Sequence, residues 1–587
     1  MVDQGHRTPT HRLRQLQRSI YRSLEAKANS LLGKTPKAIA QYEKEFLKDF
    51  RQLKLSPSRF VQKHQLITEI RESAITLVGD FHTFYQAQRT ALRFIREVIK
   101  PGENWMIGIE FLPSSSQHDL DAFQEGKIDL PEFHARVRYA EDWGFPWANY
   151  EPIFDWARAK GVRLLALNRP KELAQGDTRA RENSQLILNR VQTTTDLFER
   201  DRWAAGILLD QFENASPRIL VLFGELHLSR SHLPHQIEQI AQESLGIKIK
   251  CLSIHQTVDT LYWNLPASLP SRQTPILKIS ASQYCVFSST PWAKLQSLVS
   301  WIEGENLKAL KEVSPSHSQS SKDEEDDDDE SETDYLNAVQ TFGETISQFL
   351  DLPKLNYENL TLLTADQADL ATQLEKEDIF TPEELKALHF HIRHNLRLFI
   401  PRINVGYFGI PSQNGAAEIA AVHLLRSRTL AAGILPHTPE EWFRSIIEST
   451  FGFYGSLLLN PRRKCYLIDD HRKRVKQIKK NSPVFFPQEL ESRELTLKFL
   501  TRKQLWIPPL NTQKSRLIAL LATRHLGQVL GTQLHFALLQ GLLTPERLRY
   551  LCLARMDGSG RPYRERIEEL LGCIQQAELP ESKEDWI

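Results

Sequence analysis

The stretch Ile75-Thr76-Leu77-Val78-Gly79-Asp80-Phe81-His82 places an acid and a histidine directly after a short apolar run. Such a run predicts a buried strand, and the glycine near its end lets the chain leave the strand sharply or approach a ligand closely. The stretch Ile219-Leu220-Val221-Leu222-Phe223-Gly224-Glu225-Leu226-His227 repeats this order. We therefore predict two strands that each end in an acid–histidine pair.

Apolar runs of the same kind recur between residues 74 and 254. We expect strands at 74–80, 105–111, 162–168, 218–224 and 247–253, with a further strand or two within 275–289. Strands that alternate with helical stretches are typical of an α/β fold with a mainly parallel sheet and flanking helices. Ligands of such sheets bind beyond the carboxyl ends of the strands. Both acid–histidine pairs are therefore expected to face one crevice.

Further polar residues lie where the crevice is expected. Glu110 follows a mostly apolar run, and a buried carboxylate requires a partner. Asn168 ends the next predicted strand, where it either forms a turn or contacts a ligand. His232 follows the second pair as an additional contact. Arg200 and Asp201 lie on a predicted helix, from which either could reach the crevice, although pairing at the surface is the commoner arrangement.

An aromatic cluster lies between residues 139 and 156. Aromatic side chains offer a large contact area and stack on flat ligands, so the cluster is either packed core or the cover of such a ligand. Core packing is the favoured interpretation, and Trp147 and Tyr150 are the two candidate ligand contacts.

Length and composition set the limits of the interpretation. The chain has 587 residues, a formal net charge of +1 and five cysteines without a CxxC motif. The charge balance disfavours a nucleic-acid partner, and the cysteine pattern fits a reducing compartment. The N-terminal residues lack the apolar segment of a secretory signal, and no stretch is apolar enough to span a bilayer. We expect a cytoplasmic protein without a transmembrane segment, and a homo-oligomer is left open.

Four regions follow from the changes in composition along the chain. Eight consecutive acids, Asp323 to Glu330, cannot bury apolar area and repel one another, so they mark the main boundary. The predicted regions are a basic helical N-terminal arm at 1–69, an α/β domain at 70–312, an acidic disordered linker at 313–334 and a mainly α-helical domain at 335–587.

Four short segments resemble the ChaN-like haem-binding family, which shares a superfamily with Tiki, TraB and erythromycin-esterase-like proteins. The segments are Leu77–His82, Ile109–Leu112, Tyr150–Gly161 and Leu165–Pro170. The resemblance extends over about residues 70–255. It departs from the family pattern in Asp80, where the family usually has Glu, and in Tyr85, near a position where the family often has His. The family's lipoprotein signal is also missing.

The resemblance implies a pocket that holds either haem or a divalent metal ion. The residues it implies for a haem or iron cofactor are His82, Tyr85, Glu110, Tyr150, Asn168, His227 and His232. The residues it implies for a metal ion are Asp80, His82 and His227. The catalytic residues it implies for a metal-dependent hydrolase of the Tiki or erythromycin-esterase-like type are Asp80, His82, Glu110, Glu225 and His227.

The sequence leaves two classes of function open. A small-molecule or haem-binding protein of the ChaN type is favoured by the resemblance and by the aromatic cluster. A metal-dependent hydrolase is the alternative, because carboxylates and imidazoles at a strand edge also suit acid–base or metal chemistry. Whether the chain is an enzyme therefore depends on how these groups meet.

Overall fold

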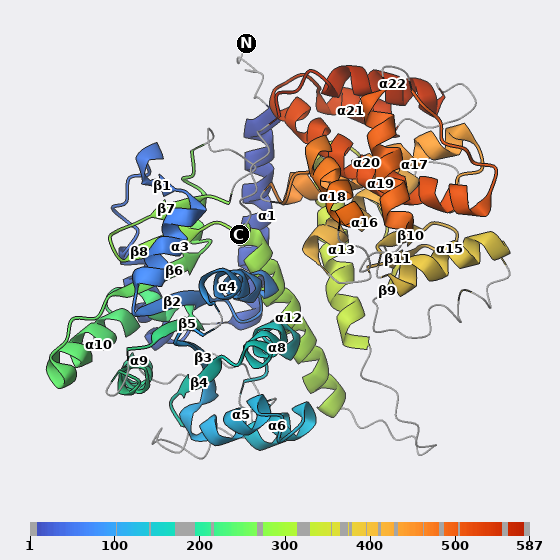
Figure 1. Cartoon of the computed structure of the whole chain (residues 1–587). Helices are drawn as coiled ribbons and strands as arrows, with labels where there is room; N and C mark the ends of the chain where they lie inside the picture. Colours follow the sequence, from blue (N-terminus) through green and yellow to red (C-terminus); the bar gives the residue numbers. More distant parts are fainter. Residues whose placement is uncertain are drawn as a thin grey trace, which may run out of the picture. The chain divides into compact units, whose positions relative to one another are not determined.

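The computed structural model describes most of the chain (Figure 1). The described residues are 9–33, 35–100, 102–139, 143–170, 194–212, 216–266, 274–313, 329–353, 355–357, 359–363, 374, 379–394, 396–408, 412–427, 433–461, 463–480, 487–502, 505–553 and 562–579. The chain divides into two units. The α/β unit comprises Leu24–Glu305 with Asp585–Ile587, and the helical unit comprises Met1–Ser23 and Asn306–Glu584.

The α/β unit is built on an eight-stranded sheet in the order β1-β7-β8-β6-β2-β5-β3-β4. The strands are β1 (Phe60–Val61), β2 (Ile75–Asp80), β3 (Trp105–Pro113), β4 (Arg163–Asn168), β5 (Arg218–Gly224), β6 (Cys251–Gln256), β7 (Ile276–Lys278) and β8 (Gln283–Val286). Neighbours from β8 to β4 pair in parallel, whereas β7 is antiparallel to both β1 and β8. The sheet is therefore mixed, and the predicted mainly parallel arrangement describes its centre.

Helices cover both faces of this sheet, because successive strand residues point to opposite sides. Leu77 lies in the core beneath α9 (Thr194–Asp210) and α10 (Leu233–Ile240), whereas Val78 lies in the core on the other face. That second core contains α3 (Lys63–Glu72), α4 (Tyr85–Val98), α5 (Gln117–Gln124), α6 (Leu130–Val137) and α8 (Glu151–Lys160). The aromatic cluster belongs to it, so the packed-core interpretation holds.

The N-terminal region contributes to the α/β unit. Helices α1 (Pro9–Leu32) and α2 (Lys37–Lys48) form as the apolar spacing predicts. Helix α2 buries Ala38, Tyr42 and Phe46, and the first two pack with Leu197 of α9. Residues 24–69, which we expected in a separate arm, therefore group with the sheet because their apolar face is buried there.

The helical unit contains the helices expected beyond residue 335 and a small three-stranded sheet, β10-β11-β9. Its helices are α13 (Asp329–Phe349), α15 (Pro382–Arg393), α16 (Gln413–Arg426), α17 (Pro439–Leu459), α18 (Ile468–Lys480), α19 (Pro487–Thr501), α20 (Gln513–Leu539), α21 (Pro545–Leu553) and α22 (Tyr563–Ile574). Its strands are β9 (Thr361–Leu363), β10 (Leu398–Ile400) and β11 (Val405–Tyr407). Thr381 caps α15 as its Thr-Pro-Glu-Glu sequence predicts. The acidic linker falls largely on residues 314–328, outside the described residues.

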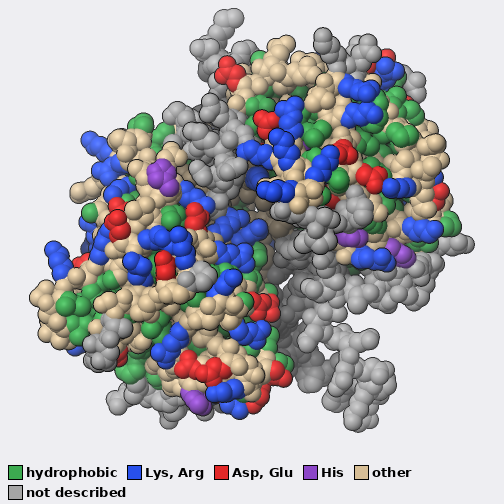
Figure 2. Space-filling view, in the orientation of Figure 1, with side chains coloured by type: hydrophobic (Ala, Val, Ile, Leu, Met, Phe, Trp, Pro, Cys, Tyr) green, Lys and Arg blue, Asp and Glu red, His purple; other side chains and the backbone are tan. Residues whose placement is uncertain are grey.

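Surface and hydropathy agree with the composition. Figure 2 shows lysine and arginine side chains interspersed with aspartate and glutamate on the visible face of the α/β unit, as the near-neutral net charge suggests. Among the helices that the structure describes, none combines the length and apolarity needed to cross a bilayer.

Candidate functional site

Strand order brings the two acid–histidine motifs and Glu110 to the same edge of the sheet. Strand β5 lies between β2 and β3, and Asp80 at the end of β2 is paired with Gly224 at the end of β5. Glu110 lies on β3 where the pairing with β4 shifts between Ile109 and Pro113. Such irregularities redirect side chains near sites. The residues that end these strands therefore meet in one place.

His82 is held in place by Asp80. The Nδ1 atom of His82 lies 2.8 Å from Oδ2 of Asp80, and the same oxygen accepts a hydrogen bond of 2.8 Å from the hydroxyl of Tyr150. The other carboxylate oxygen accepts one of 2.5 Å from Nε2 of Gln88. With Nδ1 engaged by the carboxylate, the Nε2 atom of His82 is the nitrogen left to face the site.

His227 is held by the same kind of contact from a different acid. It lies on the turn η7 (Glu225–Leu228), and its Nδ1 atom is 2.6 Å from Oδ1 of Asp201 on α9. The hydroxyl of Tyr42 on α2 donates to the other oxygen of Asp201, whose side chain is fully buried. Each histidine is therefore oriented by an aspartate that also binds a buried tyrosine.

Glu110 lies between the two imidazoles. Its Oε2 atom is 3.9 Å from Nε2 of His82, and its Oε1 atom is 4.0 Å from Nε2 of His227. Arg200 donates to Oε1 at 2.7 Å, and the backbone N–H of Gly224 donates to Oε2 at 2.6 Å. The expected convergence of the two histidines is present, with a buried carboxylate as their common neighbour.

The backbone at Gly224 forms a wall of the site and leaves little room for a side chain. A Cβ atom on Gly224 would lie 3.1 Å from Oε2 of Glu110 and 3.5 Å from Nε2 of His82. The backbone N–H therefore reaches the carboxylate because no side chain intervenes. The opening lies at His82 and Arg200, whose side chains are each 24% exposed, compared with 4% for Glu110.

The charges of the site stabilise one another. Burial disfavours the protonated form of His82, but the hydrogen bond and charge of Asp80, together with the charge of Glu110, outweigh it and raise the His82 pKa. Burial disfavours the ionised form of Glu110, but the charges of His82, Arg200 and His227 outweigh it and lower the Glu110 pKa. The centre therefore favours a glutamate anion beside a protonated imidazole.

Two other predicted residues adjoin this centre. The side-chain oxygen of Asn168 accepts a hydrogen bond of 3.1 Å from Nε of Arg200, so Asn168 positions the arginine. Tyr150 is buried and bonds to Asp80, so it supports His82 from within the core. Desolvation of its hydroxyl and the charge of Asp80 hold the Tyr150 pKa well above its ordinary value.

The remaining predicted residues point elsewhere. Glu225 pairs with Lys294 on α12 (Pro291–Val313), whose Nζ atom is 3.0 Å from both carboxylate oxygens. His232 contacts Glu45 at 3.0 Å and the carbonyl oxygen of Leu226 at 2.7 Å. Tyr85 begins α4 with 43% of its surface exposed. The contacts of Glu225 and His232 therefore hold them away from Glu110, and Tyr85 lies at the surface.

Several residues of the site carried no decisive signal in the sequence. Arg200 and Asp201 were recognised only as charges on a helix, where exposure is the usual outcome. Tyr42 lies in the region expected to be an arm, and Gln88 lies within the helix α4. A polar residue inside an amphipathic helix looks the same in sequence whether it faces water or a buried aspartate.

The donor atoms near Glu110 are not arranged as a metal site. Among the described residues, no group of three or more His, Cys, Asp and Glu side chains has a geometry that could hold a metal ion. Of the predicted set, Asp80 turns both oxygens toward Tyr150, His82 and Gln88. Asp80 therefore serves as the support of a histidine in this structure.

Comparison with known proteins confirms the resemblance for part of the α/β unit. Residues 66–184 match the family model described as haem-binding uptake, Tiki superfamily, ChaN. No curated protein sequence is significantly similar to the chain. A solved structure, described as cofacial haem binding to ChaN of Campylobacter jejuni, is 15% identical over 39% of this chain and 92% of that chain, with a TM-score of 0.28.

The matched segment contains five of eight site residues. It includes His82 with Asp80, Glu110, Tyr150 and Asn168, whereas Arg200, Asp201 and His227 follow it in the chain. The ChaN-like segment therefore supplies one histidine and the central carboxylate, and the rest of the α/β unit supplies the second histidine.

Proposed function

We propose that the α/β unit is an acid–base centre that hydrolyses a small ester. The observation that carries this proposal is the approach of two aspartate-backed imidazoles to Glu110, with Nε2 distances of 3.9 and 4.0 Å. General acid–base catalysis requires a proton donor and a proton acceptor fixed on either side of the reacting group. We choose an ester because the resemblance includes the erythromycin-esterase-like relatives.

The residues take different roles in this proposal. His82 holds a proton, since its pKa is raised, and gives it to the leaving oxygen. His227, oriented by Asp201, takes a proton from the water that attacks the carbonyl carbon. Both oxygens of Glu110 already accept hydrogen bonds, so Glu110 stabilises the imidazolium in place of attacking the substrate. The remaining N–H groups of Arg200 face the developing oxyanion.

The test uses a chromogenic ester with the full chain. We expect hydrolysis of p-nitrophenyl acetate near neutral pH, with a loss in kcat/KM of about 100-fold or more in His227→Ala. The matched control is His64→Ala, because His64 is exposed on α3. Equal rates in the wild-type protein and the His227 variant would contradict the proposal.

Haem binding is the second candidate, and it is favoured by the family match over residues 66–184. The two histidines as placed do not fit a haem. Each Nε2 atom faces Glu110 at 4.0 Å or less, whereas a histidine that binds haem iron needs room for the porphyrin ring in front of that nitrogen. The aromatic rings nearest His82, Trp143 and Phe145, are themselves buried in the core. A haem on this unit therefore needs an exposed ligand, and Tyr85 is the predicted residue that offers one.

Absorbance separates the two candidates. If haem binds through Tyr85, titration with haemin gives a saturable Soret band that Tyr85→Phe abolishes and His227→Ala leaves unchanged. A spectrum that remains that of free haemin at every ratio would remove this candidate without affecting the hydrolase test.

A further inference from the structure

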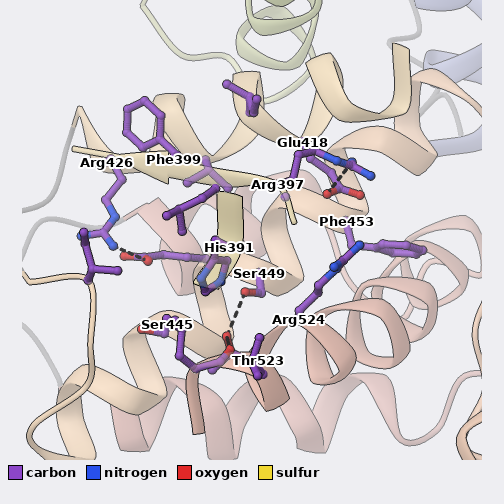
Figure 3. A pocket seen from close by; sticks show the side chains of 18 of the residues that line it. His391, Arg397, Phe399, Glu418, Arg426, Ser445, Ser449, Phe453, Thr523 and Arg524 are labelled. Carbon is purple, nitrogen blue, oxygen red and sulfur yellow. Dashed lines mark hydrogen bonds and ion pairs between the residues drawn. The ribbon is translucent and has the colours of Figure 1, made fainter. Parts of the chain in front are cut away.

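The helical unit contains a partly open cavity of about 150 Å³ among α15, α16, α17 and α20 (Figure 3). Four arginines and two glutamates line it, so its wall carries an excess of two positive charges. The charged residues are Arg397, Arg426, Arg463, Arg524, Glu418 and Glu448. The proposed esterase site lies in the other unit and does not use this cavity.

One side of the cavity gathers three of the arginines around a single acid. Glu418 pairs with Arg397 at 2.8 Å and also with Arg463, whose guanidinium lies over the ring of Phe453 at 4.0 Å. Arg524 rises from α20 on the same side (Figure 3) and interacts electrostatically with Glu418. We call Arg397, Arg463, Arg524 and Glu418 the arginine end.

Arg524 differs from the other two arginines because it forms no direct ion pair with Glu418. Its side chain is exposed and lines the cavity, and among the described residues it has no hydrogen bond and no ion pair. A guanidinium remains charged in proteins, so Arg524, which lines the cavity without a direct ion pair, can bind an incoming anion.

The opposite side of the cavity carries less positive charge and is partly apolar. Glu448 pairs there with Arg426 at 2.7 Å and with Arg444 at 3.4 Å, which leaves one positive charge against two at the arginine end. Phe399, Ile419 and Leu520 add apolar surface. Cavities of about this volume hold a benzene-sized ring. The cavity therefore combines a cationic end with room for a small apolar group.

We propose that this cavity binds a small phosphate monoester, with its phosphate at the arginine end and its organic part against the apolar wall. Three arginines and one glutamate leave two positive charges, and a phosphate monoester carries roughly −1.5 to −2 at neutral pH. A monocarboxylate neutralises only half of that charge. Guanidinium groups also bind phosphate oxygens in a paired, planar geometry.

The experiment compares phenyl phosphate with benzoate by isothermal titration calorimetry on the full chain at fixed ionic strength. The two probes share a ring and differ in the charge and geometry of the anion. We expect one phenyl phosphate per chain, bound at least tenfold more tightly than benzoate. We expect Arg524→Gln to lower the affinity for phenyl phosphate by at least tenfold.

Two controls guard against trivial explanations. Lys514→Gln removes an equal charge from an exposed position on the same helix, and we expect it to leave phenyl phosphate binding unchanged. Thermal unfolding without ligand shows whether Arg524→Gln remains folded, and we expect an unfolding midpoint close to that of the wild-type protein, because the removed guanidinium is exposed and forms no direct ion pair. Absence of saturable phenyl phosphate binding, equal affinity for benzoate, or full binding by a folded Arg524 variant would each overturn the proposal.

Discussion

The Nδ1 atom of His227 lies 2.6 Å from Oδ1 of Asp201, although Glu225 is only two residues away in the chain. In the first motif the neighbouring acid does bind its own histidine, since Asp80 ends a strand and His82 folds back onto it at 2.8 Å. In the second motif Glu225 begins the turn η7 and bonds to Lys294. Two similar motifs therefore reach the same histidine orientation by different partners.

Asp201→Asn tests whether the distant aspartate orients His227. The asparagine NH2 group either faces the Nδ1–H of His227, donor against donor, or stabilises the tautomer that carries its proton on Nε2. In both cases His227 is a poorer base, so we expect kcat/KM for p-nitrophenyl acetate to fall by about 100-fold or more. Loss of the charged hydrogen bonds also lowers the free energy of unfolding by about 1–3 kcal/mol. Asp210→Asn, at the exposed end of the same helix, is the matched control. Similar rates for both variants would show that Asp201 does not act through His227.

The stability of the α/β unit should depend on pH through His82 and Glu110. The raised His82 pKa adds stability that is complete below about pH 6.5 and is lost as the pH rises through the folded value. The lowered Glu110 pKa adds stability that is complete above about pH 4.3 and is lost as the pH falls through its folded value. Denaturation measured between these limits should therefore give the highest free energy of unfolding.

His82→Gln checks the first half of that dependence. We expect the unfolding free energy to decline less above pH 6.5 in this variant. The total loss is smaller by about 1.4 kcal/mol for each pH unit between the folded and unfolded pKa values of His82. His64→Gln should keep the wild-type slope, since His64 is exposed. An unchanged slope in the His82 variant would assign the pH dependence to other groups.

Glu110→Gln and Glu225→Gln separate the central acid from the acid of the Gly-Glu-x-His motif. Removing the charge of Glu110 takes away a stabilising neighbour of the protonated imidazole, so the His82 pKa, measured by NMR, should fall. Glu225→Gln leaves Lys294 with less compensation and should cost stability, but it should leave the His82 pKa near its wild-type value. A larger change of the His82 pKa in Glu225→Gln than in Glu110→Gln would contradict the assignment of Glu110 as the central acid.

Gly224→Ala tests the close backbone approach. The added Cβ atom meets Oε2 of Glu110 at 3.1 Å and His82 Nε2 at 3.5 Å, so we expect at least a tenfold loss of esterase activity and a destabilisation of about 1–2 kcal/mol. Gly206→Ala is the comparison, because a Cβ atom there meets nothing within 4 Å and alanine favours a helix by about 1 kcal/mol. If the two alanine variants behaved alike, the site would have more room than the structure describes.

The strands that carry the site were predictable because their apolar runs are long and bounded by polar residues. The strand predicted at 218–224 coincides with β5, and the one at 74–80 differs from β2 by one residue. The strand predicted at 247–253 begins later, at Cys251, because residues 247–250 precede the pairing with β2. The antiparallel β7 was not distinguishable, since pairing direction depends on the chain path and not on local composition.

The candidate site was predictable only for residues next to a strand end. His82, Glu110 and His227 were expected in one crevice, and they share a carboxylate neighbour. Glu225 was expected with them, but turn geometry directs its side chain to Lys294. Asp201 was weighed as a residue that could reach the crevice, but its pairing with His227 was not predicted, because a partner brought from a distant helix leaves no spacing in the sequence. The metal and haem roles of these residues remain predictions.

The convergence of the two imidazoles on Glu110 is tested most directly by side-chain ¹⁵N NMR of the wild-type protein and Glu110→Gln. We predict that the Nε2 resonances of both His82 and His227 shift in the variant, because each atom lies within about 4 Å of the altered carboxylate. Lack of a shift at either histidine, in a variant whose backbone spectrum shows that it is folded, would contradict a shared centre.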